Sequence, residues 1–418
     1  MRIAILTVGS RGDVQPYTAL AIGLGDAGHD VTLATHEPFR GFVESHGVAL
    51  APLPGDPREV LGTPEAHELL ASGRSIVRFA GRFLKVLKPW FHDLTRATAP
   101  LVAEADFVLY SPLAFTGWHQ AKARGIGTAQ AVLQPFARTG AFSTVSNGGA
   151  DHGRIINRAS HLVTEQLFWQ PLRGEVNRWR TSELGLPAQP ISGPFRELRA
   201  IAEPQLCGFS PTLVPPPSDW RREVEVTGAW FLDQPAPADP ALDAFLADGP
   251  PPVYAGFGSM VDSDAGAISD LVVRAARLAG VRLVLGSGWA GLAYEGDDVL
   301  VVGDTPHSHL FPRMAAVIHH GGAGTTHTAA RAGVPQIVVP FFADQPFWAR
   351  RVEALGIGPA GIPRKDLTTQ LLAEAIRSSS SPGTNDRANQ VGAAIAAERG
   401  VDAAVAAVAR LTAPRIPG

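Results

Sequence analysis

A glycine-rich turn between an apolar segment and a helix-like segment restricts the possible folds of this chain more than any other feature. Residues 316–318 are apolar and bounded by turn residues, as a buried parallel strand would be. Three glycines within residues 321–324 allow a tight turn with bare N–H groups, and two threonines at 325–326 are typical of a helix start. Such N–H groups and the positive end of a helix dipole can together bind a phosphate or diphosphate. The same pattern also suits a strand–helix connection whose glycines serve packing only, and the glycines alone leave both interpretations open.

Strand-like and helix-like segments alternate through both halves of the chain. This alternation predicts an α/β fold with a doubly wound parallel sheet in each half. Ligands of such sheets bind at the carboxyl ends of the strands, near the point where the strand order reverses. The expected strands are residues 2–8, 31–35, 48–53, 107–110 and 128–132 in the first half, and 252–257, 282–285, 299–302, 316–318 and 336–340 in the second.

Proline is dense between residues 210 and 252, which predicts a stiff linker with a boundary near residue 235. We therefore expect four parts: an N-terminal domain, the linker, a C-terminal domain and a last helix that packs back on the first half. Their expected ranges are 1–210, 211–250, 251–400 and 401–418. In the first domain, a polar loop and four helices are expected at residues 9–16, 17–27, 76–87, 89–104 and 157–184.

Charge and cysteine content exclude several classes of protein. The formal net charge of −3 over 418 residues shows no electrostatic footprint for nucleic acid. The single cysteine, Cys207, excludes a disulfide scaffold and a zinc site of the cysteine type. No stretch of 18 apolar residues occurs, so we expect a cytoplasmic protein without stable membrane insertion, as a monomer or weak dimer.

Three segments, in order along the chain, resemble one known family. The first is Gly-Ser-Arg-Gly-Asp-Val-Gln-Pro at residues 9–16, and the second runs from the His-His-Gly-Gly-Ala-Gly-Thr-Thr of residues 319–326 to Asp344 and Gln345. The third comprises short pieces within residues 209–228. Together they resemble the bacterial and fungal branch of the family 1 glycosyltransferases, which includes sterol and glycopeptide-antibiotic glycosyltransferases. The resemblance covers most of the chain and is weakest over residues 54–200, where such enzymes bind differing acceptors.

The resemblance implies a GT-B fold, in which two Rossmann-like domains face each other across a cleft. It also implies an inverting, metal-independent transfer of a hexose from a nucleotide-diphosphate sugar to a hydrophobic small-molecule alcohol or phenol, with no further cofactor. Such chemistry needs a base for the acceptor proton, positive groups for the leaving diphosphate, and a grip on the sugar hydroxyls.

By the same resemblance, Asp13 is the catalytic base. Other members carry a histidine there, oriented by an aspartate after a later strand, but here that strand is followed by Ser111 and Pro112. This departure favours a lone carboxylate base. An aspartate with its ordinary pKa is a weak base at pH 7, so it needs burial to raise that pKa, or it acts late, as the acceptor oxygen loses its proton. Alternatively Asp13 pairs with Arg11, and then His119 or His152 would have to be the base.

The donor site is carried over residue by residue. Diphosphate binding is expected from Ser10, Arg11, Ser259, His319, Gly322, Gly324 and Thr325, and His320 is interpreted as structural. Sugar binding is expected from Asp344 and Gln345. Binding of the nucleotide base is expected from Trp289, Thr305 and His307, although Trp289 suits a core aromatic and His307 a helix-start histidine equally well.

Two other functions on the same fold remain open from the sequence. One is a sugar-nucleotide epimerase or cell-wall intermediate transferase, and the other is a catalytically silent accessory protein. The sequence leaves UDP and dTDP open, and Gln345 favours a sugar with its ring hydroxyls, such as glucose. An apolar acceptor pocket is expected from Phe83, Trp90, Phe91, Phe115, Trp118, Phe136 and Phe142.

Overall fold

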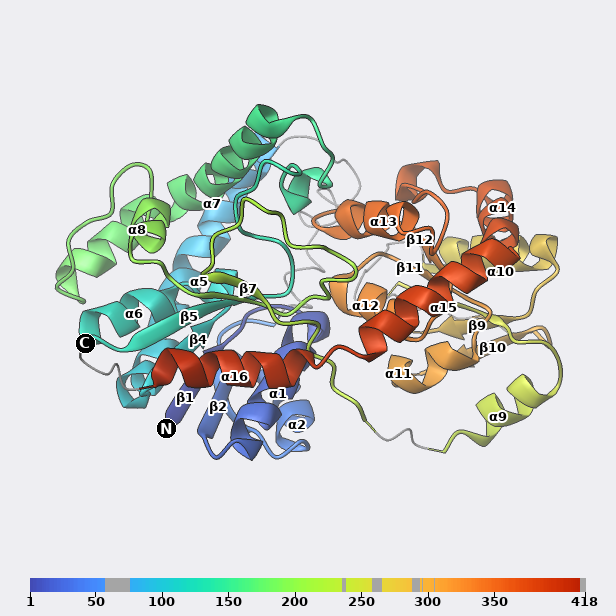
Figure 1. The fold of residues 1–418 in the computed structure, drawn as a ribbon, viewed down its shortest axis with the longest axis horizontal. Coiled ribbons are helices and arrows are strands. Elements are labelled where there is room, and N and C mark those ends of the chain that lie inside the picture. The colour runs from blue at the N-terminus through green and yellow to red at the C-terminus, as the bar shows by residue number, and fades with distance from the viewer. Residues whose placement is uncertain are drawn as a thin grey trace.

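The computed structural model describes residues 1–56, 76–234, 238–257, 265–287, 294, 296–303 and 305–413, with the backbone alone at 76–88 and 265. Two parallel sheets, each covered by helices, lie side by side in Figure 1. The expected α/β fold with one doubly wound parallel sheet per half is therefore confirmed.

The first sheet has seven strands in the order β3-β2-β1-β4-β5-β6-β7. All neighbours are parallel, and Ile5 of β1 pairs with Leu33 of β2 and Leu109 of β4. The central strands are apolar on both faces because helices cover both. The strand order reverses between β1 and β4, which places a ligand crevice beyond their carboxyl ends. The strands are β1 (Arg2–Leu6), β2 (Asp30–His36), β3 (Ala49–Leu53), β4 (Phe107–Tyr110), β5 (Gly127–Val132), β6 (Gln205–Cys207) and β7 (Val224–Val226).

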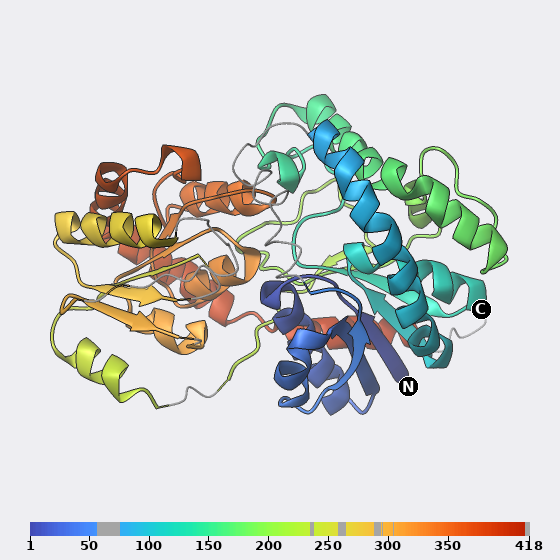
Figure 2. The ribbon, with the colours of Figure 1, turned by 180° about the vertical axis from the view of Figure 1, so that it is seen from behind.

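The helices of this domain depart from the sequence prediction at two prolines. Helix α1 begins at Arg11 and includes Pro16, so the segment predicted as a loop at residues 9–16 is mostly helical. Helix α5 is continuous through Pro89, where two helices were expected, and Figure 2 shows it as one long rod beside the sheet. Each proline removes one helical hydrogen bond, and tertiary packing of the apolar faces compensates for that loss. The helices are α1 (Arg11–Asp26), α2 (Arg40–Glu44), α5 (Ile76–Glu104), α6 (Thr116–Arg124), α7 (Arg154–Ser182) and α8 (Phe195–Ala200), with 3-10 turns η1 (Glu37–Phe39), η2 (Pro112–Ala114) and η3 (Val145–Asn147).

The second sheet has five parallel strands in the order β10-β9-β8-β11-β12, so its order reverses between β8 and β11. Its strands are β8 (Val253–Gly256), β9 (Leu283–Gly286), β10 (Val299–Val302), β11 (Ala316–His319) and β12 (Gln336–Val338). Its helices are α9 (Pro240–Ala247), α10 (Ala265–Ala279), α11 (His307–Leu310), α12 (Ala323–Arg331), α13 (Gln345–Ala354), α14 (Thr369–Ser379) and α15 (Pro382–Ala396), with 3-10 turns η4 (Phe311–Arg313) and η5 (Arg364–Asp366).

The last helix, α16 (Gly400–Thr412), leaves the second domain and lies along α1 of the first, as Figure 1 shows in red. Its buried Ala404, Ala407 and Val408 belong to the same apolar core as the centre of α1. Arg410 donates a hydrogen bond of 2.6 Å to Glu225 of β7. Strand β7 lies inside the segment predicted as a linker, so the first sheet extends to residue 226. Among the described helices, none is both long and apolar enough to cross a bilayer.

Candidate functional site

A cavity of about 2460 Å³ is lined by residues of both domains. The segments after β1, β4 and β5 line it from the first domain, and the segments after β10, β11 and β12 line it from the second. Helices α1 and α12 contact each other, which brings the carboxyl ends of the two sheets together. Both points of strand-order reversal therefore open into one space, as the sequence predicted for a ligand site.

Asp13 lies in the first turn of α1 and lines this cavity. Its Oδ2 accepts hydrogen bonds from the backbone N–H of Ser10 at 2.8 Å and from Ser10 Oγ at 3.1 Å. The preceding Gly9 donates its N–H to Nε2 of His36, 3.3 Å away, and His36 Nδ1 lies 3.1 Å from the carbonyl oxygen of Pro54. The carboxylate is thus held by the helix start, and no local pattern in the sequence pointed to His36 as the partner of Gly9.

Burial raises the pKa of two carboxyl groups that line the cavity, one from each domain. It raises the pKa of Asp13 above the ordinary value, although hydrogen bonds from Ser10 oppose the rise. It raises the pKa of Asp344 to about 6, where the hydrogen bond from Trp348 opposes the rise and the charge of Asp13 adds to it. The two carboxyl groups therefore interact electrostatically, and Asp13 is a stronger base than an exposed aspartate.

The two histidines considered as alternatives to Asp13, His119 and His152, have surroundings that differ from those of Asp13. His119 also borders the cavity, but its ring is buried and Nδ1 lies 2.6 Å from NH1 of the buried Arg180. Burial lowers its pKa well below the ordinary value, and the charge of Arg180 adds to this. His152 is exposed and lies outside the cavity lining. Of these groups, Asp13 is the one that lines the cavity with a raised pKa, and its role as the base stays a prediction.

Helix α12 begins at the cavity with open N–H groups. The first backbone hydrogen bond of the helix runs from Thr326 to the carbonyl of Gly322, and no side chain caps this end. The N–H groups of Ala323, Gly324 and Thr325 precede that bond, and all three residues line the cavity. Gly324 and Thr325 thus present open N–H groups to the cavity, as does Ala323, which was not expected from the sequence. Such a helix start can hold an anion, and diphosphate binding here stays a prediction.

The two histidines before this turn differ in their access to the cavity. His319 is fully buried, with Nδ1 accepting from the N–H of Gly321 at 3.0 Å and Nε2 lying 2.9 Å from Oε1 of Gln336. Burial lowers its pKa to about 3, so the ring is neutral. The His319 ring thus holds the turn and is not among the residues that line the cavity, and its expected contact with a diphosphate stays a prediction.

His320, interpreted as structural from the sequence, lines the cavity. Its ring lies so close to Gly322 that a Cβ built on that glycine would come closer than 3.0 Å to His320 Nε2. Burial lowers its pKa to about 4, and the charge of nearby His307 acts in the same direction. His320 is therefore a neutral ring beside the open helix start.

The loop between β12 and α13 presents Asp344 and Gln345 to the cavity. Asp344 Oδ2 accepts a hydrogen bond of 2.7 Å from Trp348 Nε1. Gln345 Oε1 accepts the backbone N–H groups of Phe341 at 2.7 Å and Phe342 at 3.2 Å. Gln345 therefore shapes the loop that carries Asp344, and hydroxyl binding by both side chains stays a prediction.

The remaining residues expected to bind the donor fall into three groups. Thr305 and His307 line the cavity beside Tyr254, whose hydroxyl lies 3.3 Å from His307 Nε2. The His307 ring also stacks on Phe311 at 4.4 Å, so it belongs to an aromatic cluster that the sequence did not reveal. Ser10 and Arg11 line the cavity from α1, and the Arg11 guanidinium lies 5.0 Å from the Phe42 ring centre. The expected roles of Ser259 and Trp289 lie outside the described residues.

Most of the expected acceptor aromatics reach the cavity. Those lining it are Trp90, Phe115, Trp118 and Phe136. Phe91 is instead buried against Trp179 of α7, with ring centres 5.5 Å apart, and Phe142 packs against Phe347 of the second domain at 5.7 Å. The Phe83 side chain lies outside the described residues. Within the described residues, no three His, Cys, Asp or Glu side chains gather as metal ligands would.

Comparisons with known proteins agree with this geometry. A family model described as the glycosyltransferase family 28 N-terminal domain matches residues 3–105, and one described as the erythromycin biosynthesis protein CIII-like C-terminal domain matches residues 290–409. The sterol 3-beta-glucosyltransferase of Cryptococcus neoformans var. neoformans is 35% identical over 441 aligned residues, covering 98% of this chain and 27% of that protein. The chain thus spans about a quarter of the length of that curated relative.

Two solved structures share the fold. The glycosyltransferase VinC in complex with DTDP aligns with a TM-score of 0.67 at 22% identity over 99% of both chains. CalG4, the calicheamicin glycosyltransferase, aligns with a TM-score of 0.69 at 19% identity over 100% of this chain and 99% of that one. The expected GT-B fold is confirmed by these likenesses and by the two parallel-sheet domains.

Proposed function

Because this chain belongs to the family 1 glycosyltransferases, we propose that it transfers a hexose from a nucleotide-diphosphate sugar to a hydroxyl of a hydrophobic small molecule. The donor is UDP- or dTDP-glucose, and the transfer inverts the anomeric centre without a metal. One observation carries the proposal. A buried carboxylate on α1 and the open start of α12 face the same cavity from opposite domains.

Asp13 begins the reaction by taking the proton of the acceptor hydroxyl. The acceptor oxygen then forms a bond to the anomeric carbon of the sugar from the side opposite the diphosphate, which inverts that carbon. The raised pKa of Asp13 helps, because a stronger base accepts the proton earlier in bond formation. Hydrogen bonds from Ser10 keep the carboxylate in place during this step.

The bond between the anomeric carbon and the diphosphate oxygen breaks in the same step, and the electron pair leaves with the diphosphate. The N–H groups of Ala323, Gly324 and Thr325 and the α12 dipole stabilise the charge that develops there. The neutral His320 ring lies beside this helix start. Asp344 accepts hydrogen bonds from the sugar hydroxyls, which orients the anomeric carbon toward the acceptor.

The direct test incubates the purified chain with UDP-glucose or dTDP-glucose and a panel of apolar alcohols and phenols. We expect a mass gain of one hexose on at least one acceptor and, by NMR, the opposite anomeric configuration to the donor. Chelation by EDTA should leave the rate unchanged. A chain that binds nucleotide but transfers sugar to no acceptor would favour the silent accessory protein instead.

Gly324→Ala is expected to weaken binding of the nucleotide sugar by about tenfold, an affinity loss near 1.4 kcal/mol. A methyl group there meets no protein atom within 4 Å and occupies open space beside the diphosphate cradle. Calorimetric titration with UDP-glucose measures the loss. Gly383→Ala is the matched control, because Gly383 is also the second residue of its helix and also faces open space. Equal affinity changes in both variants would contradict the cradle.

Lowering the pH below about 6 is expected to raise the KM for the nucleotide sugar. Asp344, whose pKa is raised to about 6, then becomes protonated and loses its ability to accept hydrogen bonds as a carboxylate. The rise should approach roughly tenfold per pH unit below the pKa. In Asp344→Asn the KM should be high at every pH, with no such rise. If the KM of Asp344→Asn kept the native pH dependence, a group other than Asp344 would be responsible for it.

A further inference from the structure

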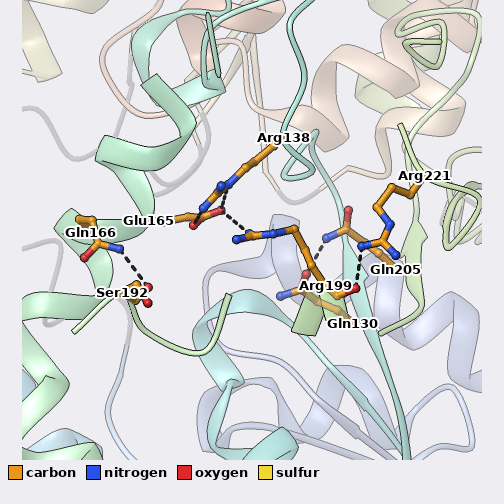
Figure 3. A network of polar contacts seen from close by, with 8 residues as sticks. All are labelled: Gln130, Arg138, Glu165, Gln166, Ser192, Arg199, Gln205 and Arg221. Atoms are coloured by element: carbon orange, nitrogen blue, oxygen red, sulfur yellow. Dashed lines mark hydrogen bonds and ion pairs between the residues drawn. The ribbon is translucent and has the colours of Figure 1, made fainter. Parts of the chain in front are cut away.

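An arginine-rich network lines the cavity on the side of the first domain and has no part in the steps above. It is formed by side chains from four separate places in the chain, shown together in Figure 3. Arg138 follows β5, Glu165 lies on α7, Arg199 lies on α8, and Arg221 precedes β7. Since these segments enclose the region assigned to the acceptor, the network bears on what the acceptor carries.

The single carboxylate at the centre is already occupied. Arg138 Nε donates to Glu165 Oε1 at 2.6 Å, and the second arm of the Arg138 guanidinium pairs with Glu165 Oε2. Arg199 NH1 reaches the same Oε1 at 3.5 Å, the outer limit of a hydrogen bond. Charge-assisted bonds are normally about 2.7–2.9 Å long. Figure 3 shows both guanidinium groups converging on this one glutamate.

Arg199 is also crowded by like charges. Its pKa is lowered, first by burial and then by the charges of Arg138 and Arg221, while Glu165 opposes the shift. Arg221 NH1 donates to the backbone carbonyl of Arg199 at 2.6 Å, and its own carboxylate partner is Glu223, 3.3 Å away. Among these five cavity-lining groups, the three cations exceed the two anions by one.

Apolar side chains line the same cavity as this excess charge. Phe168 on α7, Phe195 and Leu198 on α8, and Phe136 after β5 line the same cavity. A guanidinium that is partly removed from water, and that shares its only described carboxylate partner with Arg138, gains from pairing with a further anion. A molecule that fits here has an apolar body and one anionic group.

We propose that the acceptor is a hydroxylated, mainly apolar carboxylic acid whose carboxylate pairs with Arg199 while its hydroxyl faces Asp13. This inference rests on the proposed glycosyl transfer and adds the charge of the acceptor. Arg199 determines specificity in this scheme and takes no part in the bond changes. Glu165 keeps Arg138 paired, so the incoming carboxylate meets Arg199 as its partner.

The test compares cholic acid with methyl cholate, which share the ring system and hydroxyls and differ in charge. With the native chain, we expect kcat/KM for the acid to exceed that for the ester by tenfold or more, as for a charge-assisted pair. In Arg199→Gln, kcat/KM should fall for the acid and stay unchanged for the ester, so the preference should vanish. Arg199→Lys should restore part of it. Binding of both compounds without donor, measured by tryptophan fluorescence, should follow the same order.

Arg196→Gln is the matched control, because Arg196 lies on the same short helix but is exposed and outside the cavity lining. It should leave the preference unchanged. Equal kcat/KM for acid and ester in the native chain would overturn the inference. Equal losses of kcat/KM for both in Arg199→Gln would also overturn it and leave Arg199 with a structural role. Transfer to neutral alcohols without any preference for acids overturns the inference alone. Absence of transfer to every acceptor overturns the proposed function.

Discussion

Asp13→Asn is expected to lower kcat by about 10³-fold, in the range lost when a general base is removed. Asparagine has nearly the same shape, and its amide oxygen still accepts the hydrogen bonds that Ser10 donates to Asp13. It cannot accept a proton from the acceptor hydroxyl, so the chemical step fails while the helix start stays intact. Steady-state kinetics with UDP-glucose and a neutral alcohol acceptor measure the loss.

The control for this variant is binding of the nucleoside diphosphate alone. The proposed diphosphate cradle is at the start of α12 in the other domain, so the affinity for the nucleoside diphosphate should change by less than about twofold, under 0.5 kcal/mol. A thermal melt should show the same unfolding temperature to within a few degrees. Loss of nucleotide binding would mean that Asp13 holds the donor, and turnover within tenfold of native would return the role of base to His119.

Gly9→Ala is expected to lower kcat by about 10²-fold, the effect of displacing a catalytic group by about 1 Å. Gly9 has a φ of +147°, and a Cβ at this position would come closer than 3.0 Å to Asp13 Oδ2. The methyl group must push the carboxylate aside or break its hydrogen bonds to Ser10. The variant should still fold, with a loss of about 1–3 kcal/mol from backbone strain.

Gly28→Ala separates backbone strain from displacement of the base. Gly28 follows the other end of the same helix, has a φ of +87°, and its Cβ would meet no atom within 4 Å. Gly28→Ala should lose about as much stability as Gly9→Ala, but its kcat should stay unchanged. Urea unfolding gives the stability of both variants and steady-state kinetics gives their rates. A Gly9→Ala chain that loses stability but keeps native kcat would show that the carboxylate position is not critical.

The sequence predicted those parts of the site that depend on local patterns. A strand, a glycine turn and a helix start at residues 316–326 are local, and so is the open N-terminus of α12. The same holds for Asp344 after β12. Each side chain lies where its neighbours along the chain direct it, so the motif was enough to place it in the cavity.

Parts that depend on distant residues were not predictable. The His319 ring pairs with Gln336, 17 residues later on the next strand, so the difference in cavity access between His319 and His320 has no local signal. The start of α1 was placed too late because Gly12 and Pro16 read as loop residues, whereas Ser10 and Asp13 stabilise the helix start. The contacts around Arg199 join segments between 22 and 61 residues apart, which no local pattern reveals.

The crossing of α16 back to α1 has a consequence for recombination between related chains. Gly400 packs so closely on the backbone of Ala229 that a side chain there has no room, and Val401 occupies the space beside Gly23. The structural unit that carries Asp13 therefore consists of two separate stretches of gene, one ending after β7 and one encoding the last helix. A hybrid that exchanges the second domain needs two crossover points, one on each side of residues 238–396. With both, α1 keeps its native partner helix α16.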